Sequence, residues 1–297
     1  MGTVFVYSEG YLADIGAHVF PIEKYRLVYQ QLRHRGILSG NPIEPAPASR
    51  ADLLLVHEPS YVDDLLQARL SPRTASSELP ISREIIDAFL LASGGTICAC
   101  EKALETGSAV NLAGGFHHSF PDHAEGFCYV NDMALGIRRL QHLQKGLRAA
   151  VIDCDLHQGN GTAFIFKDDP SVYTFSMHQR DLYPLKEDSN WDIHLRNGAG
   201  DDEYLALLEK AVPAIIQRFK PDFVLYQAGA DPYKEDQLGD LKLTIEGLKR
   251  RDGLVFDECK KHGIPVAALL GGGYAMNTND TVTIHVNTCL AAVEYFG

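Results

Sequence analysis

The sequence repeatedly places a short apolar run before a polar or glycine-rich segment, and a stretch with helical periodicity usually follows. Apolar runs of four to six residues that end in polar loops are typical of buried strands, and strands that alternate with helices form parallel sheets. The pattern therefore predicts an α/β fold, a three-layer α/β/α arrangement with a mostly parallel central sheet. The clearest runs are Ala109 to Leu112, Leu147 to Ile152, Phe223 to Gln227 and Pro265 to Leu270.

The other segments fit this alternation. The Gly94-Gly95 pair inside the longest helical pattern predicts close packing or a kink there, and Pro213 should bend another helix. We expect further strands at residues 3–7, 53–56 and 172–176, and helices at residues 22–38, 62–68, 81–105, 130–143, 201–219, 244–262 and 280–296. Residues 41–49 and 71–79 are expected to be loops.

Four unusual polar segments follow predicted strands directly. They contain His117-His118, Asp155 with His157, Asp231, and Gly271 to Tyr274. Because ligands of open α/β sheets bind beyond the carboxyl ends of the strands, we expect these segments to converge at one edge of the sheet.

The segment after residue 152 carries Asp153, Asp155 and His157 at alternate positions, so a continuing strand would point all three the same way. Two carboxylates are costly to bury together unless a cation compensates them, and a divalent metal is the simplest one. The alternative is an N-cap cluster that merely starts a helix. With Asp231, three ligands would leave positions open for water and substrate, as catalytic Zn²⁺ requires, although the two carboxylates also suit Fe²⁺. Taken alone, Asp231 before Pro232 also fits a turn.

The adjacent His117 and His118 lie in a glycine-rich loop, where imidazoles are rarely needed for packing. One could take a proton from water and the other could hydrogen-bond a developing tetrahedral centre. Tyr274, after three glycines, could donate its hydroxyl to a substrate carbonyl. The alternatives are a histidine that caps backbone groups and a tyrosine that only packs.

Composition narrows the class of protein. The 297 residues have no linker, repeat or low-complexity tract, so we expect one domain over residues 1–297. A net charge of −12, with no cluster of basic residues, argues against direct nucleic-acid binding, whereas lysine-rich peptides or polyamines would be tolerated. The six cysteines form no C-x-x-C pair, so we expect free thiols. Without an apolar leader or membrane-length apolar stretch, we expect a soluble, cytoplasmic protein.

In combination, these residues resemble the zinc-dependent histone deacetylase family, including its bacterial acetoin-utilisation and acetylpolyamine deacetylase relatives. The similarity spans about residues 50 to 280 in the family's order. It rests on Asn111 to His118 (NLAGGFHH), Glu125 to Asp132 (EGFCYVND), Asp153 to Gly161 (DCDLHQGNG), Gln227 to Asp231 (QAGAD) and Leu270 to Tyr274 (LGGGY).

The resemblance implies the arginase/deacetylase fold and a role for each matching residue. Asp155, His157 and Asp231 would bind Zn²⁺. His118 would be the general base, with His117 as its electrostatic companion. Tyr274 would polarise the amide carbonyl of the substrate. Asp153 would orient His117 and Asn160 would orient His118. The resemblance further implies an acyl-lysine channel lined by Gly126, Phe127 and Leu238, and a structural K⁺ held partly by Asp153, Asp155 and Ser176.

Two positions depart from the best-known members. Class I members carry Asp at the position of Asn160, whereas class II, class IV and bacterial members resemble this chain there. Because the Asn160 amide is neutral, we expect His118 to be less basic than in class I members. Residues 71–80 show no clear counterpart of the acidic residue with which many eukaryotic members hold the peptide backbone. Arginases share the implied fold but use two manganese ions and additional aspartates, whereas one metal fits this sequence better.

The resulting expectation is a metal-dependent amidohydrolase that removes acetyl or longer acyl groups from lysine Nε of proteins or peptides. A deacetylase of small acylated amines such as acetylpolyamines is the alternative in the same reaction class. A non-catalytic acyl-lysine binding module is the alternative from another class. The length of the acyl chain and the oligomeric state are not predicted.

Overall fold

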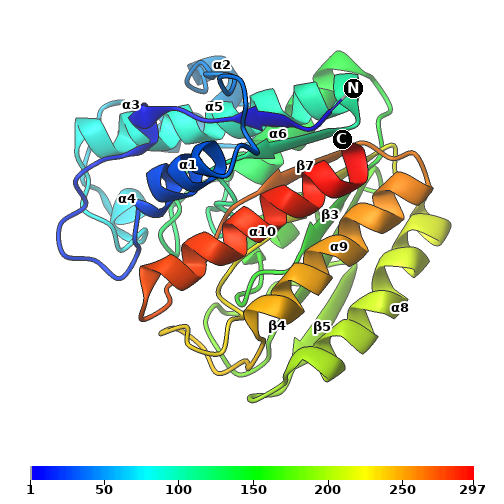
Figure 1. Cartoon of the computed structure of the whole chain (residues 1–297). Helices are drawn as coiled ribbons and strands as arrows, with labels where there is room; N and C mark the ends of the chain where they lie inside the picture. Colours follow the sequence, from blue (N-terminus) through cyan, green and yellow to red (C-terminus); the bar gives the residue numbers. More distant parts are fainter. Residues whose placement is uncertain (1) are drawn as a thin grey trace.

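The fold is built on one seven-stranded sheet, in which every neighbouring pair of strands is parallel. It is seen in a computed structural model that describes residues 2–297 (Figure 1). The strand order is β1-β2-β7-β6-β3-β4-β5. The strands are β1 (Val4–Val6), β2 (Ser108–Asn111), β3 (Ala149–Asp153), β4 (Val172–Gln179), β5 (Trp191–Leu195), β6 (Phe223–Gln227) and β7 (Val266–Leu269).

Helices cover both faces of this sheet. In Figure 1, α8, α9, α10 and α1 form a layer in the foreground, whereas α5 packs with α6 behind the sheet. The helices are α1 (Lys24–His34), α2 (Arg50–Leu53), α3 (Pro59–Leu66), α4 (Pro72–Ala75), α5 (Arg83–Thr106), α6 (Asp132–Leu143), α7 (Asn160–Phe166), α8 (Asp201–Phe219), α9 (Ile245–Lys261) and α10 (Thr278–Phe296), with a short 3₁₀ helix at Glu9–Tyr11. The predicted three-layer α/β/α arrangement is confirmed.

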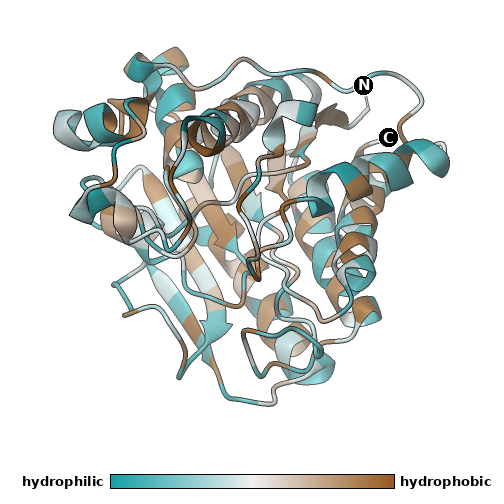
Figure 2. Ribbon diagram, turned by 90° about the vertical axis from the view of Figure 1, so that its left-hand side faces the viewer, coloured by the Kyte–Doolittle hydropathy of each residue, from teal (hydrophilic) through white to brown (hydrophobic). Residues whose placement is uncertain are grey.

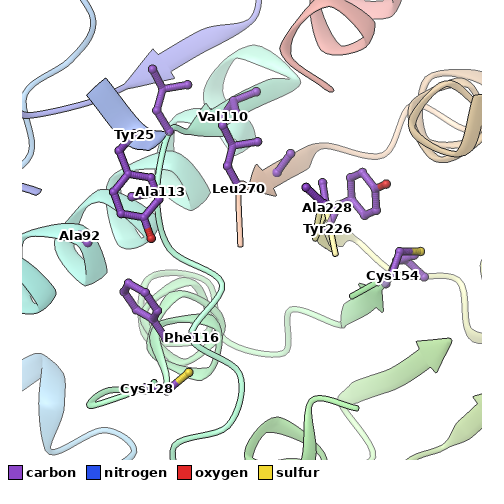
Figure 3. Packing of buried hydrophobic residues seen from close by; sticks show 14 of the residues in the cluster. Tyr25, Ala92, Val110, Ala113, Phe116, Cys128, Cys154, Tyr226, Ala228 and Leu270 are labelled. Carbon is purple, nitrogen blue, oxygen red and sulfur yellow. The ribbon is translucent and has the colours of Figure 1, made fainter. Parts of the chain in front are cut away.

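The central strands are buried on both faces, as their unbroken apolar runs predict. Successive side chains of β3 enter different clusters, since Val151 packs with residues of α5 and α6 whereas Ile152 joins the larger cluster on the other side. Figure 2 shows this apolar interior between helices whose outer surfaces are hydrophilic. Figure 3 shows part of the larger cluster, to which Val110, Tyr226 and Leu270 contribute.

The helix α5 is continuous across Gly94 and Gly95, so the pair serves close packing. A Cβ at Gly94 would collide with the carbonyl group of Ala46. Likewise, α8 continues through Pro213. The six cysteines are free thiols, as expected.

Local predictions differ from the structure in four places. Residues 53–56 are not a strand, because Ser49 and Asp52 form a capping box that starts α2 instead. The loop predicted at residues 71–79 contains the short helix α4. The prediction also lacked β5 and α7, and α7 begins at Asn160, inside the polar motif itself.

None of the helices within residues 2–297 combines the length and apolar character needed to cross a bilayer.

Candidate metal centre and catalytic site

Asp155, His157 and Asp231 come together as predicted. One potential ligand atom from each lies within 4.8 Å of the others, and all three residues are buried. The Nδ1 atom of His157 lies 3.3 Å from Asp155 Oδ1 and 3.4 Å from Asp231 Oδ2, so Nδ1 is the nitrogen that faces the carboxylates. Two carboxylates and one imidazole form a ligand set that suits Zn²⁺ or Fe²⁺.

The surroundings of this cluster fit a bound cation. Asp231 Oδ2 is buried and has no hydrogen-bond partner among residues 2–297, although a buried carboxylate oxygen is costly to leave unpaired. Burial alone would lower the pKa of His157, but Asp155 and Asp231 raise it to about 10. The site thus attracts positive charge, which a divalent ion would supply in place of the proton.

The backbone wraps around the carboxylates rather than extending as a strand. Because β3 ends at Asp153, the predicted strand alternation does not carry Asp155 and His157 to the site. A tight loop does so: the amide of His157 donates to Asp155 Oδ1 at 3.0 Å, and the amide of Leu156 donates to Asp231 Oδ1 at 3.0 Å. Asp231 Oδ1 is therefore engaged, and Oδ2 is free to bind a metal.

Arg251 of α9 joins the two loops that carry these residues. Its guanidinium is fully buried and donates to the carbonyl oxygen of Gly229 at 2.6 Å and to that of Cys154 at 3.3 Å. Its charge is paired with Asp252 at 2.8 Å. Asp252 in turn accepts hydrogen bonds from the hydroxyls of Tyr226 and Thr288, both at 2.6 Å. The buried ion pair thus ties the loop after β3 to the loop after β6.

The loop that carries the histidine pair is held by a buried carboxylate. Asp132, at the start of α6, accepts hydrogen bonds from the amides of Gly115 at 3.0 Å and Phe116 at 2.7 Å. The Gln227 side chain donates to the Gly115 carbonyl at 2.9 Å. These contacts fix the backbone directly before His117 and His118.

The two histidines have different partners and opposite pKa shifts. His117 Nδ1 lies 2.7 Å from Asp153 Oδ2, whereas His118 Nδ1 lies 2.7 Å from Asn160 Oδ1. Burial would lower the pKa of His117, but Asp153 and Asp155 raise it to about 9. Burial, together with His117 and His157, holds the pKa of His118 well below its usual value. The surroundings of His117 therefore favour its charged form, whereas those of His118 favour its neutral form.

Tyr274 is held at the same edge of the sheet. Its backbone amide donates to Asp236 Oδ2 at 2.7 Å, and its ring makes edge contacts with Phe20 and Phe127. Burial, reinforced by Asp231 and Asp155, raises the pKa of its hydroxyl well above the usual value. The phenol stays protonated and can serve as a donor.

A channel of about 330 Å³ leads to these residues. It is lined by the predicted Gly126, Phe127 and Leu238, and also by Glu78, Leu182, Tyr183, His118, His157 and Tyr274. Glu78 is an exposed acidic residue of the loop at residues 71–80, where no such residue was identified from the sequence. A smaller cavity of about 30 Å³ lies at the site itself: His117, His118, Asp155, His157 and Tyr274 line it together with Tyr25, Phe116, Cys128 and Gly272.

Ser176, predicted to help hold K⁺, lies opposite Asp153 in the register of β3 and β4. Its hydroxyl is 2.9 Å from His178 Nδ1.

The structure brings the predicted ligands, histidines and tyrosine together but adds residues that the sequence did not single out. Contacts between distant parts of the chain bring four further residues to the site, namely Arg251, Asp132, Glu78 and Tyr183. Lys24 is a further case: it is fully buried, its Nζ donates to the Gly272 carbonyl, and burial lowers its pKa to about 8. A lysine within the periodic pattern of a helix gives no local signal of such a position.

Comparisons with known proteins agree with the fold and the arrangement of the site. The histone deacetylase domain matches residues 18–289. Histone deacetylase 2 of Arabidopsis thaliana is 33% identical over 91% of this chain and 74% of its own length. The acetoin utilization protein AcuC of Bacillus subtilis is 30% identical over 92% of this chain and 77% of its own.

An uncharacterized protein of Picosynechococcus is 43% identical over 96% of both chains. Among solved structures, a crystal structure of an HDAC homolog complexed with SAHA superposes with a TM-score of 0.87, at 26% identity, and covers 98% of this chain and 84% of that one. The chain belongs to the histone deacetylase family. Family membership supports deacetylase activity and a hydrolytic reaction.

Proposed function

We propose that this protein is a metal-dependent deacetylase that hydrolyses the amide of acetylated lysine side chains. The observation that carries the proposal is the convergence of Asp155, His157 and Asp231 with the pair His117 and His118 and with Tyr274. The pKa of His117 and of Tyr274 is raised and that of His118 is lowered, and each direction agrees with the role proposed for that group. A non-catalytic binding module would not need this division of charge.

Asp155, His157 and Asp231 would hold a divalent ion, with Zn²⁺ the first choice and Fe²⁺ the second. When bound, the ion supplies Lewis acidity, lowering the pKa of a water ligand and polarising the substrate carbonyl. His118 accepts the proton of the attacking water and later delivers it to the leaving amine. Charged His117 and the hydroxyl of Tyr274 stabilise the negative charge that develops on the tetrahedral centre.

We propose the following roles for the other residues that the sequence singled out. Asp153 orients His117, and Asn160 orients His118. Gly126, Phe127 and Leu238 line the channel for the lysine chain. Asp153, Asp155 and Ser176 are proposed to help hold a structural K⁺. We also propose that residues 1–297 act as one catalytic domain and that the protein is cytoplasmic.

The small size of the cavity at the site favours acetyl over longer acyl groups. A cavity needs about 10–15 Å³ to hold one water molecule, so about 30 Å³ admits a methyl group but no extended chain. Long acyl groups would have to displace the packed rings of Tyr25 and Phe116.

We propose lysine peptides as the first substrates to test because the channel is lined largely by apolar and aromatic side chains, which suit the aliphatic part of a lysine, whereas exposed Glu78 in the same lining would also tolerate a polyamine. Hydrolysis of a panel of substrates tests the proposal. Zinc-reconstituted protein is given lysine peptides carrying acetyl, butyryl, octanoyl and myristoyl groups, and N-acetylated polyamines.

We expect release from acetyl-lysine peptides, with rates that fall as the chain lengthens. Faster release of acetate from N-acetylated polyamines would instead identify small acylated amines as the substrates. Metal binding without release from any substrate would favour the binding module.

A further inference from the structure

Glu125 connects the wall of the channel to His118 through a chain of hydrogen bonds. Its Oε1 atom accepts from Asn160 Nδ2 at 2.8 Å and from the Tyr183 hydroxyl at 2.9 Å. Asn160 Oδ1 lies 2.7 Å from His118 Nδ1. The inner members are buried, with His118 5% and Asn160 2% exposed, whereas 23% of the Glu125 side chain is exposed at the rim.

A tight turn fixes the position of Glu125. The backbone amides of Glu125 and Cys128 donate to each other's carbonyl oxygens at 3.1 and 2.8 Å. Between them, Gly126 and Phe127 have φ angles of 49° and 63°, which strains the phenylalanine. A Cβ at Gly126 would stand 2.5 Å from the Tyr183 hydroxyl oxygen and 2.7 Å from His118 Cδ2. The turn therefore holds Glu125, Tyr183 and His118 close together.

Only one arrangement of donors and acceptors satisfies the hydrogen bonds that link Glu125, Asn160 and His118. An ionised carboxylate only accepts hydrogen bonds, so the Asn160 atom that faces Glu125 must be the NH₂ group. The opposite atom is then the carbonyl oxygen, which also only accepts. His118 Nδ1 must therefore carry hydrogen, and the neutral ring keeps its lone pair on Nε2.

The neighbouring histidine agrees with this arrangement. The Nε2 atoms of His117 and His118 are 3.1 Å apart, so one must donate to the other. The Asp153 carboxylate only accepts, so His117 Nδ1 carries a hydrogen, and because the Nε2 lone pair of His118 is an acceptor, His117 Nε2 carries the other. His118 also lines the channel and the smaller cavity, where substrate and water would react.

We propose that Glu125 is a positioning residue for the deacetylation reaction. It fixes the direction of the Asn160 amide and, through that amide, the tautomer of His118 that can act as a base. An aspartate at position 160 would need no such partner, because both of its oxygens accept. The asymmetric Asn160 needs Glu125 to choose its direction. This inference rests on the proposed function, because the tautomer matters only if His118 accepts a proton.

Exchanging the carboxylate of Glu125 and the amide of Asn160 tests the proposal by steady-state kinetics. In Asn160→Asp alone, two carboxylates would face each other across 2.8 Å and repel, so kcat should fall. In the double variant Glu125→Gln with Asn160→Asp, an amide again faces a carboxylate and kcat should recover. Glu125→Ala should lower kcat by about ten- to a hundredfold with little change in KM, as expected for a residue that orients a base.

The matched control is Asp168→Asn. It also removes one acidic group, but Asp168 is exposed and its side chain makes no hydrogen bond or ion pair within residues 2–297, whereas acidic residues nearer the site such as Asp122 are linked to Glu125 through His123. The control should leave kcat unchanged. Circular dichroism of each variant separates a loss of folding from a loss of positioning.

A second measurement reads the tautomer without turnover. In ¹⁵N-labelled zinc-loaded protein, the His118 resonances, assigned through their loss in His118→Ala, should show a protonated Nδ1 and an unprotonated Nε2. Glu125→Ala should mix the two tautomers. If wild-type protein hydrolyses no acylated amine, the proposed function fails and this measurement alone decides the role of Glu125. A protonated Nε2 in wild type, or a double variant no more active than Asn160→Asp, would overturn the proposal.

Discussion

At the residue scale, the site separates two adjacent histidines by their partners. His117 faces the Asp153 carboxylate, which favours a charged ring with hydrogens on both nitrogens, and His118 faces the neutral Asn160 amide, which favours a neutral ring. We propose that these adjacent, similarly buried imidazoles serve as a fixed positive charge and as a base.

Replacing each histidine separately tests this division. His118→Ala should lower kcat by about a hundred- to ten-thousandfold, because it removes the group that takes and returns the proton. His117→Ala should lower kcat less, because Tyr274 and the metal still stabilise the developing charge. Steady-state kinetics on an acetyl-lysine peptide measures both. Near-wild-type kcat in His118→Ala would show that the base lies elsewhere.

The sequence motifs predicted the residues proposed to carry the chemistry better than the residues that hold them in place. Asp155, His157, Asp231 and Tyr274 were predicted because each lies in a polar or glycine-rich segment that follows an apolar run and matches a family motif. Glu125 stood inside a matching motif, but its bond to Asn160 depends on how two loops approach. No local pattern shows such an approach.

At the element scale, four neighbouring strands carry the site. Strands β2, β7, β6 and β3 are adjacent, and the segments after them supply the histidines, Tyr274, Asp231 and Asp155. The alternation of strands and helices was predictable because central parallel strands are continuous apolar runs. The edge strand β5 was missed because it is only partly buried and its apolar residues alternate with polar ones instead of forming a run.

Helix α9 contributes to the site from outside the sheet through Arg251. Arg251→Met should weaken zinc binding by about ten- to a hundredfold, because the loops that carry Asp155 and Asp231 lose their common donor. It should also destabilise the fold by roughly 3–5 kcal/mol, since Asp252 is left buried without its cation. Competition with a chromophoric chelator measures the affinity, and urea unfolding measures the stability.

The neighbouring Arg250 is exposed and provides the control, since Arg250→Met should change neither quantity. Adding Asp252→Asn to Arg251→Met should restore part of the stability without restoring zinc affinity. If zinc affinity returned together with stability, Arg251 would be a purely structural residue.

At the scale of the whole molecule, the metal is expected to stabilise the fold. A ligand that binds only the folded state at a hundred times its Kd adds about 2.7 kcal/mol, which for a chain of this size raises Tm by several degrees. Differential scanning calorimetry of zinc-loaded and chelator-stripped protein measures the shift. Equal Tm values, with zinc shown to be bound, would mean that the site also binds in the unfolded chain.

The central claim is that one metal ion, held by Asp155, His157 and Asp231, makes this chain a deacetylase. Titrating metal-free protein with Zn²⁺ while following the hydrolysis of an acetyl-lysine peptide tests it most directly. Activity should rise from none to a plateau at one Zn²⁺ per chain, and Asp231→Asn should remove the rise. Activity that persists without metal, or needs two ions per chain, would contradict the account.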